Sequence, residues 1–101
     1  MKFEIYQLKD GDENRFIRFE SYENARERKP ELSIRDYNHV YSGEIDDVGN
    51  DMVMLESLFV KFNIDIPKGF VGHHSLSVSD IIKLGKKMYY VDVFGYKEVN
   101  I

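Results

Sequence analysis

The sequence contains no cysteine, which excludes disulfide bonds, thiolate metal sites and cysteine nucleophiles. Small secreted domains often depend on disulfides, so their absence favours a reducing compartment. Long apolar runs are also missing, since the longest is Met52 to Leu55, far shorter than a membrane span. Residues 1–9 are interrupted by polar and charged side chains and lack the apolar core of a signal peptide. We therefore expect a cytoplasmic protein that does not contact membranes.

Basic charge is scarce. The chain carries 14 Lys and Arg against 18 Asp and Glu, for a net charge of −4. Nucleic-acid-binding proteins usually present a basic face, because phosphate contacts supply much of their affinity. Lys83, Lys86 and Lys87 offer one local basic patch near a turn. Nucleic acid is therefore not the partner that the composition favours.

The length and composition indicate one small folded domain spanning residues 1–101. Of the 101 residues, 43% are hydrophobic, including seven Phe and seven Tyr. A chain of this length can bury roughly 60–70% of the surface that its unfolded form exposes. No repeat, low-complexity segment or long linker divides it. We expect a single core and no second domain.

Alternating apolar and polar residues predict several strands. Residues 3–8 form the first, and Asp10-Gly11 predicts a hairpin turn into a second strand at residues 15–19. A third strand is predicted at residues 37–45, with Tyr37, His39 and Tyr41 on one face and a bulge at Gly43.

Further strands are predicted near the end of the chain. Residues 88–94 are rich in aromatic and β-branched side chains, and residues 96–99 continue after Gly95. Residues 81–84 offer one more strand. Tyr89 and Tyr90 must face opposite sides of their strand, which predicts one in the core and one exposed.

Two helices are predicted. In residues 51–63, Leu55, Leu58, Phe59 and Phe62 recur at i, i+3, i+4 and i+7 and form one apolar stripe. Asn50 or Asp51 can cap its start, and Asn63 can take a left-handed conformation at its end. A shorter helix at residues 21–29 begins with Ser21 as N-cap and ends before Pro30. The fold class is therefore α+β, with a mostly antiparallel sheet of about five strands, open or partly closed like a barrel.

The polar segment from residue 72 to residue 80 contains the candidate site residues His73, His74, Ser75, Ser77, Ser79 and Asp80. A hydrolytic site would need a nucleophile beside a base that a third group orients. Residues so close together in an extended segment do not ordinarily converge in this way, and no G-x-S-x-G elbow is present. Adjacent histidines on extended backbone point to opposite faces, so a shared metal ion is not expected either. We predict no catalytic residues, no metal and no cofactor.

Tyrosine is frequent, and tyrosine is enriched at protein interfaces because it is amphipathic and loses little entropy on binding. We therefore add Tyr89 and Tyr96 to the candidate binding residues. Stacking of nucleic-acid bases on these rings would require basic neighbours. A Ser-Asp turn before Ile81-Ile82 also resembles the start of a strand in small barrels of the ASCH and PUA type, which often bind RNA.

Several motifs together resemble the YodL-like domain family. They are FEIYQLK at residues 3–9, YNHVYSGEI at 37–45, MLESLFVKFN at 54–63, PKGFVGH at 67–73 and SLSVSDIIKL at 75–84, followed by YYVDVFGYKEV at 89–99. Tyr96 stands where the family pattern has Phe, and His73-His74 replaces a single His. The resemblance implies a bacterial domain found alone or within large proteins of mobile elements. It implies no catalytic residue.

The leading hypothesis is a non-catalytic bacterial interaction module that binds another protein, with a mobile element as its setting. A nucleic-acid or nucleotide binder of the ASCH or PUA type is the first alternative. A small hydrolase that uses residues 73–80 is the second.

Overall fold

The computed structural model describes all residues from Met1 to Ile101. Its elements are β1 (Lys2–Leu8), α1 (Asp12–Arg15), α2 (Tyr22–Arg28), the 3-10 turn η1 (Ile34–Asp36), β2 (Tyr37–Glu44), α3 (Asp51–Ile64), β3 (Ile81–Leu84), β4 (Lys87–Val91) and β5 (Tyr96–Val99). The five strands form one antiparallel sheet in the order β2-β1-β3-β4-β5. The sheet is open, because β2 and β5 are its two edges and do not pair with each other. The α+β prediction is confirmed.

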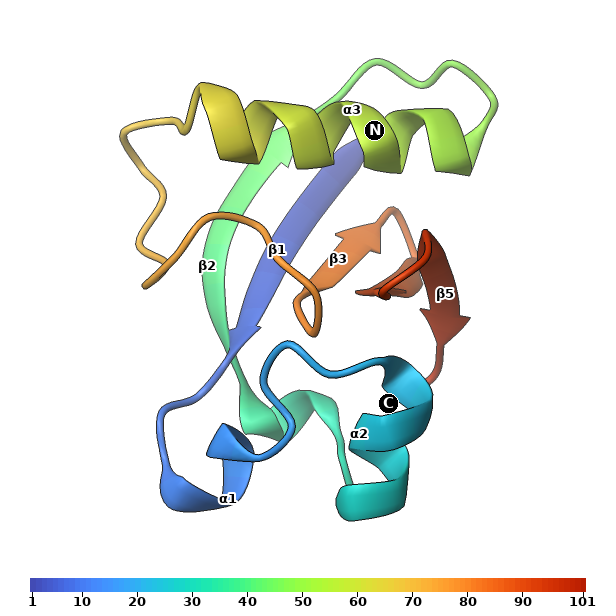
Figure 1. Ribbon diagram of the computed structural model, residues 1–101. Coiled ribbons are helices and arrows are strands. Elements are labelled where there is room, and N and C mark those ends of the chain that lie inside the picture. Colours follow the sequence, from blue (N-terminus) through green and yellow to red (C-terminus); the bar gives the residue numbers. More distant parts are fainter.

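Hydrophobic clusters cover both faces of the sheet. On one face, Leu55, Leu58 and Phe62 of α3 pack against strand residues such as Ile5 and Ile82. On the other face, Ala25 of α2 and Ile17 pack against Ile81 and Tyr90. Figure 1 shows α3 on one side of the strands and α1 and α2 on the other.

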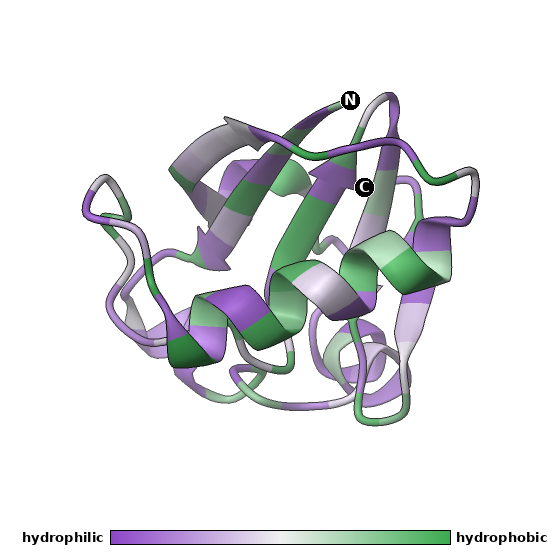
Figure 2. Ribbon diagram, turned by 90° about the horizontal axis from the view of Figure 1, so that it is seen from above, coloured by the Kyte–Doolittle hydropathy of each residue, from purple (hydrophilic) through white to green (hydrophobic).

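The α3 helix begins where the sequence predicts. The Asn50 side chain accepts a hydrogen bond from the Val53 N–H, which confirms the N-cap. Three of the four residues of the predicted apolar stripe are buried, and Phe59 is half-buried. The helix ends one residue later than predicted, because Asn63 stays helical, and its side chain donates to the carbonyls of Phe59 and Leu76. Figure 2 shows this helix crossing the strands with green segments along its length.

The predicted strand at residues 15–19 is wrong. Gly11, with φ of 151°, leads into α1, and the chain then turns through Phe16 and Phe19, which stay exposed. The partner of β1 is β2, far along the chain, and β3 lies on its other side. The short α2 at residues 22–28 confirms the predicted helix, including the Ser21 cap, whose side chain accepts from the Asn24 N–H.

The predicted bulge and face assignment in β2 also need correction. The register shifts between Ile5 and Tyr6, where Val40 is the extra residue, so the bulge is not at Gly43. The bulge moves Tyr37 and Tyr41 into different clusters. Gly43 instead lets the Phe3 ring lie close to the β2 backbone, because a Cβ at residue 43 would lie 2.9 Å from that ring.

Near the end of the chain, β4 stops at Val91 rather than residue 94. Val91 pairs with Tyr96 across a tight turn. Tyr89 and Tyr90 do face opposite sides of the sheet, but both are buried, because a cluster covers each face. The predicted exposure of one of them is therefore wrong. None of the helices is long and apolar enough to cross a membrane.

Candidate functional site

The polar segment at residues 72–80 is held against the sheet by the side chain of Gln7, which is 2% exposed. Gln7 lies on the same face of β1 as Phe3 and Ile5. Its Oε1 accepts from the His73 N–H at 3.1 Å, and its Nε2 donates to the His74 carbonyl at 2.9 Å. Nε2 also donates to Asp80 Oδ2 at 3.1 Å. One buried amide therefore satisfies three groups of a segment with no regular secondary structure.

Asp80 closes the other end of this segment from a buried position. Its Oδ2 also accepts from the Ser77 N–H at 2.9 Å, while its Oδ1 has no hydrogen-bond partner. Burial raises the pKa of Asp80 from 3.8 to about 8, and the hydrogen bonds from Ser77 and Gln7 and the charge of Arg18 oppose the rise only in part. Asp80 therefore holds a proton readily at neutral pH.

His74 is oriented by the backbone. Its Nδ1 lies 2.7 Å from the Ser75 carbonyl, which can only accept, so we assign the proton to Nδ1. Gln7 Nε2 lies 3.2 Å from the same nitrogen, but its two hydrogens go to the His74 carbonyl and to Asp80. Nδ1 lies 4.0 Å from Asp80 Oδ2, and the Phe19 ring meets the imidazole edge-on at 5.3 Å. No hydrogen bond joins His74 to a serine hydroxyl. The Ser77 hydroxyl donates instead to the Ser75 carbonyl. The three residue types of a hydrolase are thus neighbours without the contacts that activate a nucleophile.

Ser79 and Leu76 anchor the same segment in the interior. Ser79 adopts φ of 86°, a conformation that is uncommon without glycine. Its Oγ accepts from the Phe19 N–H at 3.1 Å, and its carbonyl accepts from the Tyr37 hydroxyl at 2.8 Å. Leu76 is 1% exposed and belongs to the hydrophobic cluster between α3 and the sheet. Most of the polarity of residues 72–80 therefore serves to fix the backbone.

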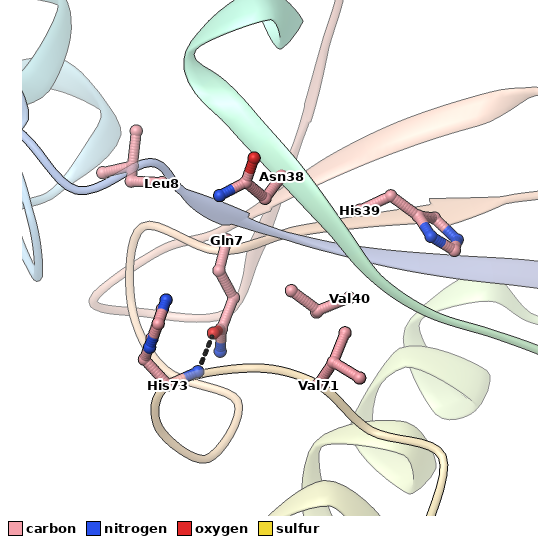
Figure 3. A pocket seen from close by; sticks show the side chains of 7 residues that line it. All are labelled: Gln7, Leu8, Asn38, His39, Val40, Val71 and His73. Carbon is pink, nitrogen blue, oxygen red and sulfur yellow. Dashed lines mark hydrogen bonds between the residues drawn. The ribbon is translucent and has the colours of Figure 1, made fainter.

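A hollow of about 260 Å³ lies beside this segment, lined by Gln7, Leu8, Asn38, His39, Val40, Val71 and His73. Figure 3 shows Gln7 and His73 at one side and Val40 and Val71 at the other, while His39 points away. His73 Nε2 lies 3.6 Å from Asp10 Oδ2. The Val71 N–H donates to the Val40 carbonyl, so the residue just before this segment covers part of the β2 edge.

The two candidate tyrosines lie elsewhere. Tyr89 is buried under α3, and its hydroxyl donates to Asp51. The Tyr96 hydroxyl donates to Glu56 of α3 at 2.8 Å, and burial together with that carboxylate raises the Tyr96 pKa. Tyr96 also lines a hollow of about 200 Å³ between α3 and the β4–β5 turn, together with Phe59, Val78 and Val93. The candidate residues therefore form three separate places rather than one site.

The basic residues near the β3–β4 turn do not form a free cationic surface. Lys83 lies 3.9 Å from Glu4, and Lys87 lies 3.9 Å from Asp51. Lys86 and Lys87 are both exposed, but only Lys86 among the three lysines has no carboxylate partner.

Sequence reasoning missed Gln7 and Phe94. The signal for Gln7 was present, because a polar residue occupies a position where the alternation of β1 calls for an apolar one. Phe94 is 95% exposed at the β4–β5 turn, and no local pattern distinguishes it from a core aromatic residue.

Comparison with known proteins gives two matches. A family model described as the YodL-like domain matches residues 2–101. An uncharacterized protein of Acanthamoeba polyphaga mimivirus is 34% identical over 77 residues, with 65% of this chain and 71% of the viral protein covered. No solved structure matches the chain. The family description names no activity.

Proposed function

The chain belongs to the YodL-like domain family, and from that premise we propose that it is a non-catalytic module that binds another protein. The main support is Phe94. It stands almost fully in solvent beside Val93, which is also exposed. Aromatic side chains contribute strongly to protein interfaces.

The turn itself does not require an aromatic residue. The Asp92 N–H donates to the Gly95 carbonyl at 2.9 Å, and Gly95 takes a φ of 78°. Asp92 Oδ1 accepts from the Val93 N–H and from the Tyr22 N–H. Because Asp92 and Gly95 hold the turn, Phe94 is free to serve contacts outside the chain.

The second part of the proposal concerns the genetic and cellular setting of the protein. The family resemblance supports an accessory role in a mobile element. A cytoplasmic location remains a prediction from the sequence.

Site-specific photocrosslinking tests the proposal. A photoreactive phenylalanine is placed at Phe94, and a matched control at Phe16, which is 61% exposed near α1. In the lysate of a cell that encodes the protein, position 94 should give one discrete crosslinked protein that persists across several salt concentrations. Position 16 should not. Equal, diffuse crosslinking from both positions contradicts the proposal.

A further inference from the structure

The β5 edge of the sheet has no neighbour. Figure 1 shows β5 at one side of the sheet with no further strand beside it. The opposite edge differs, because Val71 donates to the Val40 carbonyl of β2. The backbone of β5 makes no hydrogen bond outside its pairing with β4.

The register shows which backbone groups of β5 face outward. Asp92 and Gly95 form the hydrogen-bonded pair that closes the turn. In an antiparallel ladder, such pairs alternate with pairs that are not hydrogen-bonded. The Val91–Tyr96 and Tyr89–Glu98 pairs are therefore not hydrogen-bonded to each other. The N–H and C=O groups of Tyr96 and Glu98 consequently point away from β4.

A hollow lies on each face of this edge. On the α3 face is the hollow of about 200 Å³ lined by Phe59, Val78, Val93 and Tyr96. On the α2 face is a hollow of about 410 Å³ lined by Tyr22, Glu23, Arg26, Asp92 and Lys97. Successive residues of a strand point to opposite faces, so an added strand would place alternate side chains into these two hollows.

The charges of the α2-face hollow favour an acidic side chain. Lys97 and Arg26 lie 5.9 and 6.0 Å from the centre of the Tyr22 ring. Neither forms an ion pair, and Arg26 donates one hydrogen bond to the Leu32 carbonyl. Of the two acids there, Asp92 already accepts hydrogen bonds from two backbone N–H groups, and Glu23 is exposed. A residue opposite Lys97 faces the α2 side, where opposite charges on paired strands attract. The residue opposite Glu98 faces α3, where a base is favoured.

A second copy of the chain fits poorly. Opposite residues of antiparallel strands share a face, so two copies of β5 related by a two-fold axis can pair only residues of the same face. The two registers that pair three residues of β5 place Lys97 opposite Lys97 or Glu98 opposite Glu98. Both juxtapositions repel. The charges that discourage self-association leave the edge open to a different strand.

We propose that β5 receives an extended segment of a partner protein as a sixth strand, with an apolar side chain opposite Tyr96, an acid opposite Lys97 and a base opposite Glu98. The apolar side chain fills the α3-face hollow, and the acid lies by Lys97 and Arg26. Val93 and Phe94 extend the contact beyond the strand. This inference rests on the proposed binding of another protein and specifies how that binding occurs.

Selection from a display library of random peptides tests the inference. The protein should enrich peptides with adjacent apolar, acidic and basic residues, in one chain direction. With Lys97→Glu, the acid at the middle position should be replaced by a base, and a peptide selected by the unaltered protein should bind about tenfold more weakly. Lys86→Glu makes the same change of charge at the β3–β4 turn and should leave both results unchanged.

The alternative outcomes separate the two proposals. No enrichment, or the same pattern with Lys97→Glu as without it, overturns strand pairing at β5. If crosslinking from position 94 still captures a discrete protein in that case, the interaction module survives and only the strand pairing fails. If crosslinking also fails, both proposals fail.

Discussion

Replacement of Asp80 by Asn should remove a pH dependence of stability that the unaltered protein shows. Asp80 is buried, and its pKa rises from 3.8 to about 8 on folding. Between those two values, the folded protein holds a proton that the unfolded chain releases. Stability is therefore full below about pH 4 and falls as the pH rises towards 8.

The slope of the unfolding free energy against pH gives the size of the expected effect. One proton bound only in the folded state corresponds to about 1.4 kcal/mol per pH unit, so the contribution should fall by about 2.7 kcal/mol between pH 5 and pH 7. Asn resembles the protonated carboxyl, because its oxygen can accept from Ser77 and Gln7 as Oδ2 does. The variant should therefore fold and lack this slope.

Urea unfolding followed by circular dichroism measures both proteins at several pH values. The difference between the two free energies of unfolding isolates Asp80, because other titrating groups act equally in both. Parallel profiles would refute the reasoning and show that Asp80 is ionised when folded. If the variant does not fold, an NMR titration of the Asp80 carboxyl carbon in the unaltered protein decides the same point.

Urea unfolding tests two further substitutions at the candidate site and a third in β2, with Gly49→Ala as a comparison. Gln7→Ala should cost about 3 kcal/mol, because it leaves the His73 N–H and the His74 carbonyl without their partner, and a change below 1 kcal/mol would contradict that role. Leu76→Ala should cost about 2–5 kcal/mol through the cavity it opens, and a neutral result would show that residues 72–80 do not plug the core. Gly43→Ala should cost about 1–3 kcal/mol, because its Cβ would press on the Phe3 ring, whereas Gly49→Ala meets no neighbouring atom and tests backbone strain alone.

The sequence predicted elements best where the pattern was long. Over α3, four apolar residues at helical spacing and a cap at Asn50 agree with the structure. The segment at residues 15–19 was too short for its alternation to carry the same weight, and Asp10-Gly11 was mistaken for a hairpin turn. The pairing of β1 with β2 and β3 depends on contacts between residues far apart in the chain, which local patterns do not contain.

The candidate site was harder to predict for a related reason. The sequence groups residues 73–80 in one polar segment, but the side chain that holds this segment is Gln7, more than sixty residues earlier in the chain. Tyr89 and Tyr90 were expected to differ in exposure because a sheet with one covered face was assumed. The second cluster, built from α2 and its neighbours, buries Tyr90 as well.

The central claim is that an extended segment pairs with β5, and amide hydrogen exchange tests it most directly. NMR measures the exchange of the Tyr96 and Glu98 amides with and without the peptide that the display library enriches. Their N–H groups face outward, so exchange should slow at these two amides when the peptide binds. The amides of β2 should be unaffected. Unchanged exchange at Tyr96 and Glu98 while the peptide is bound would contradict the account.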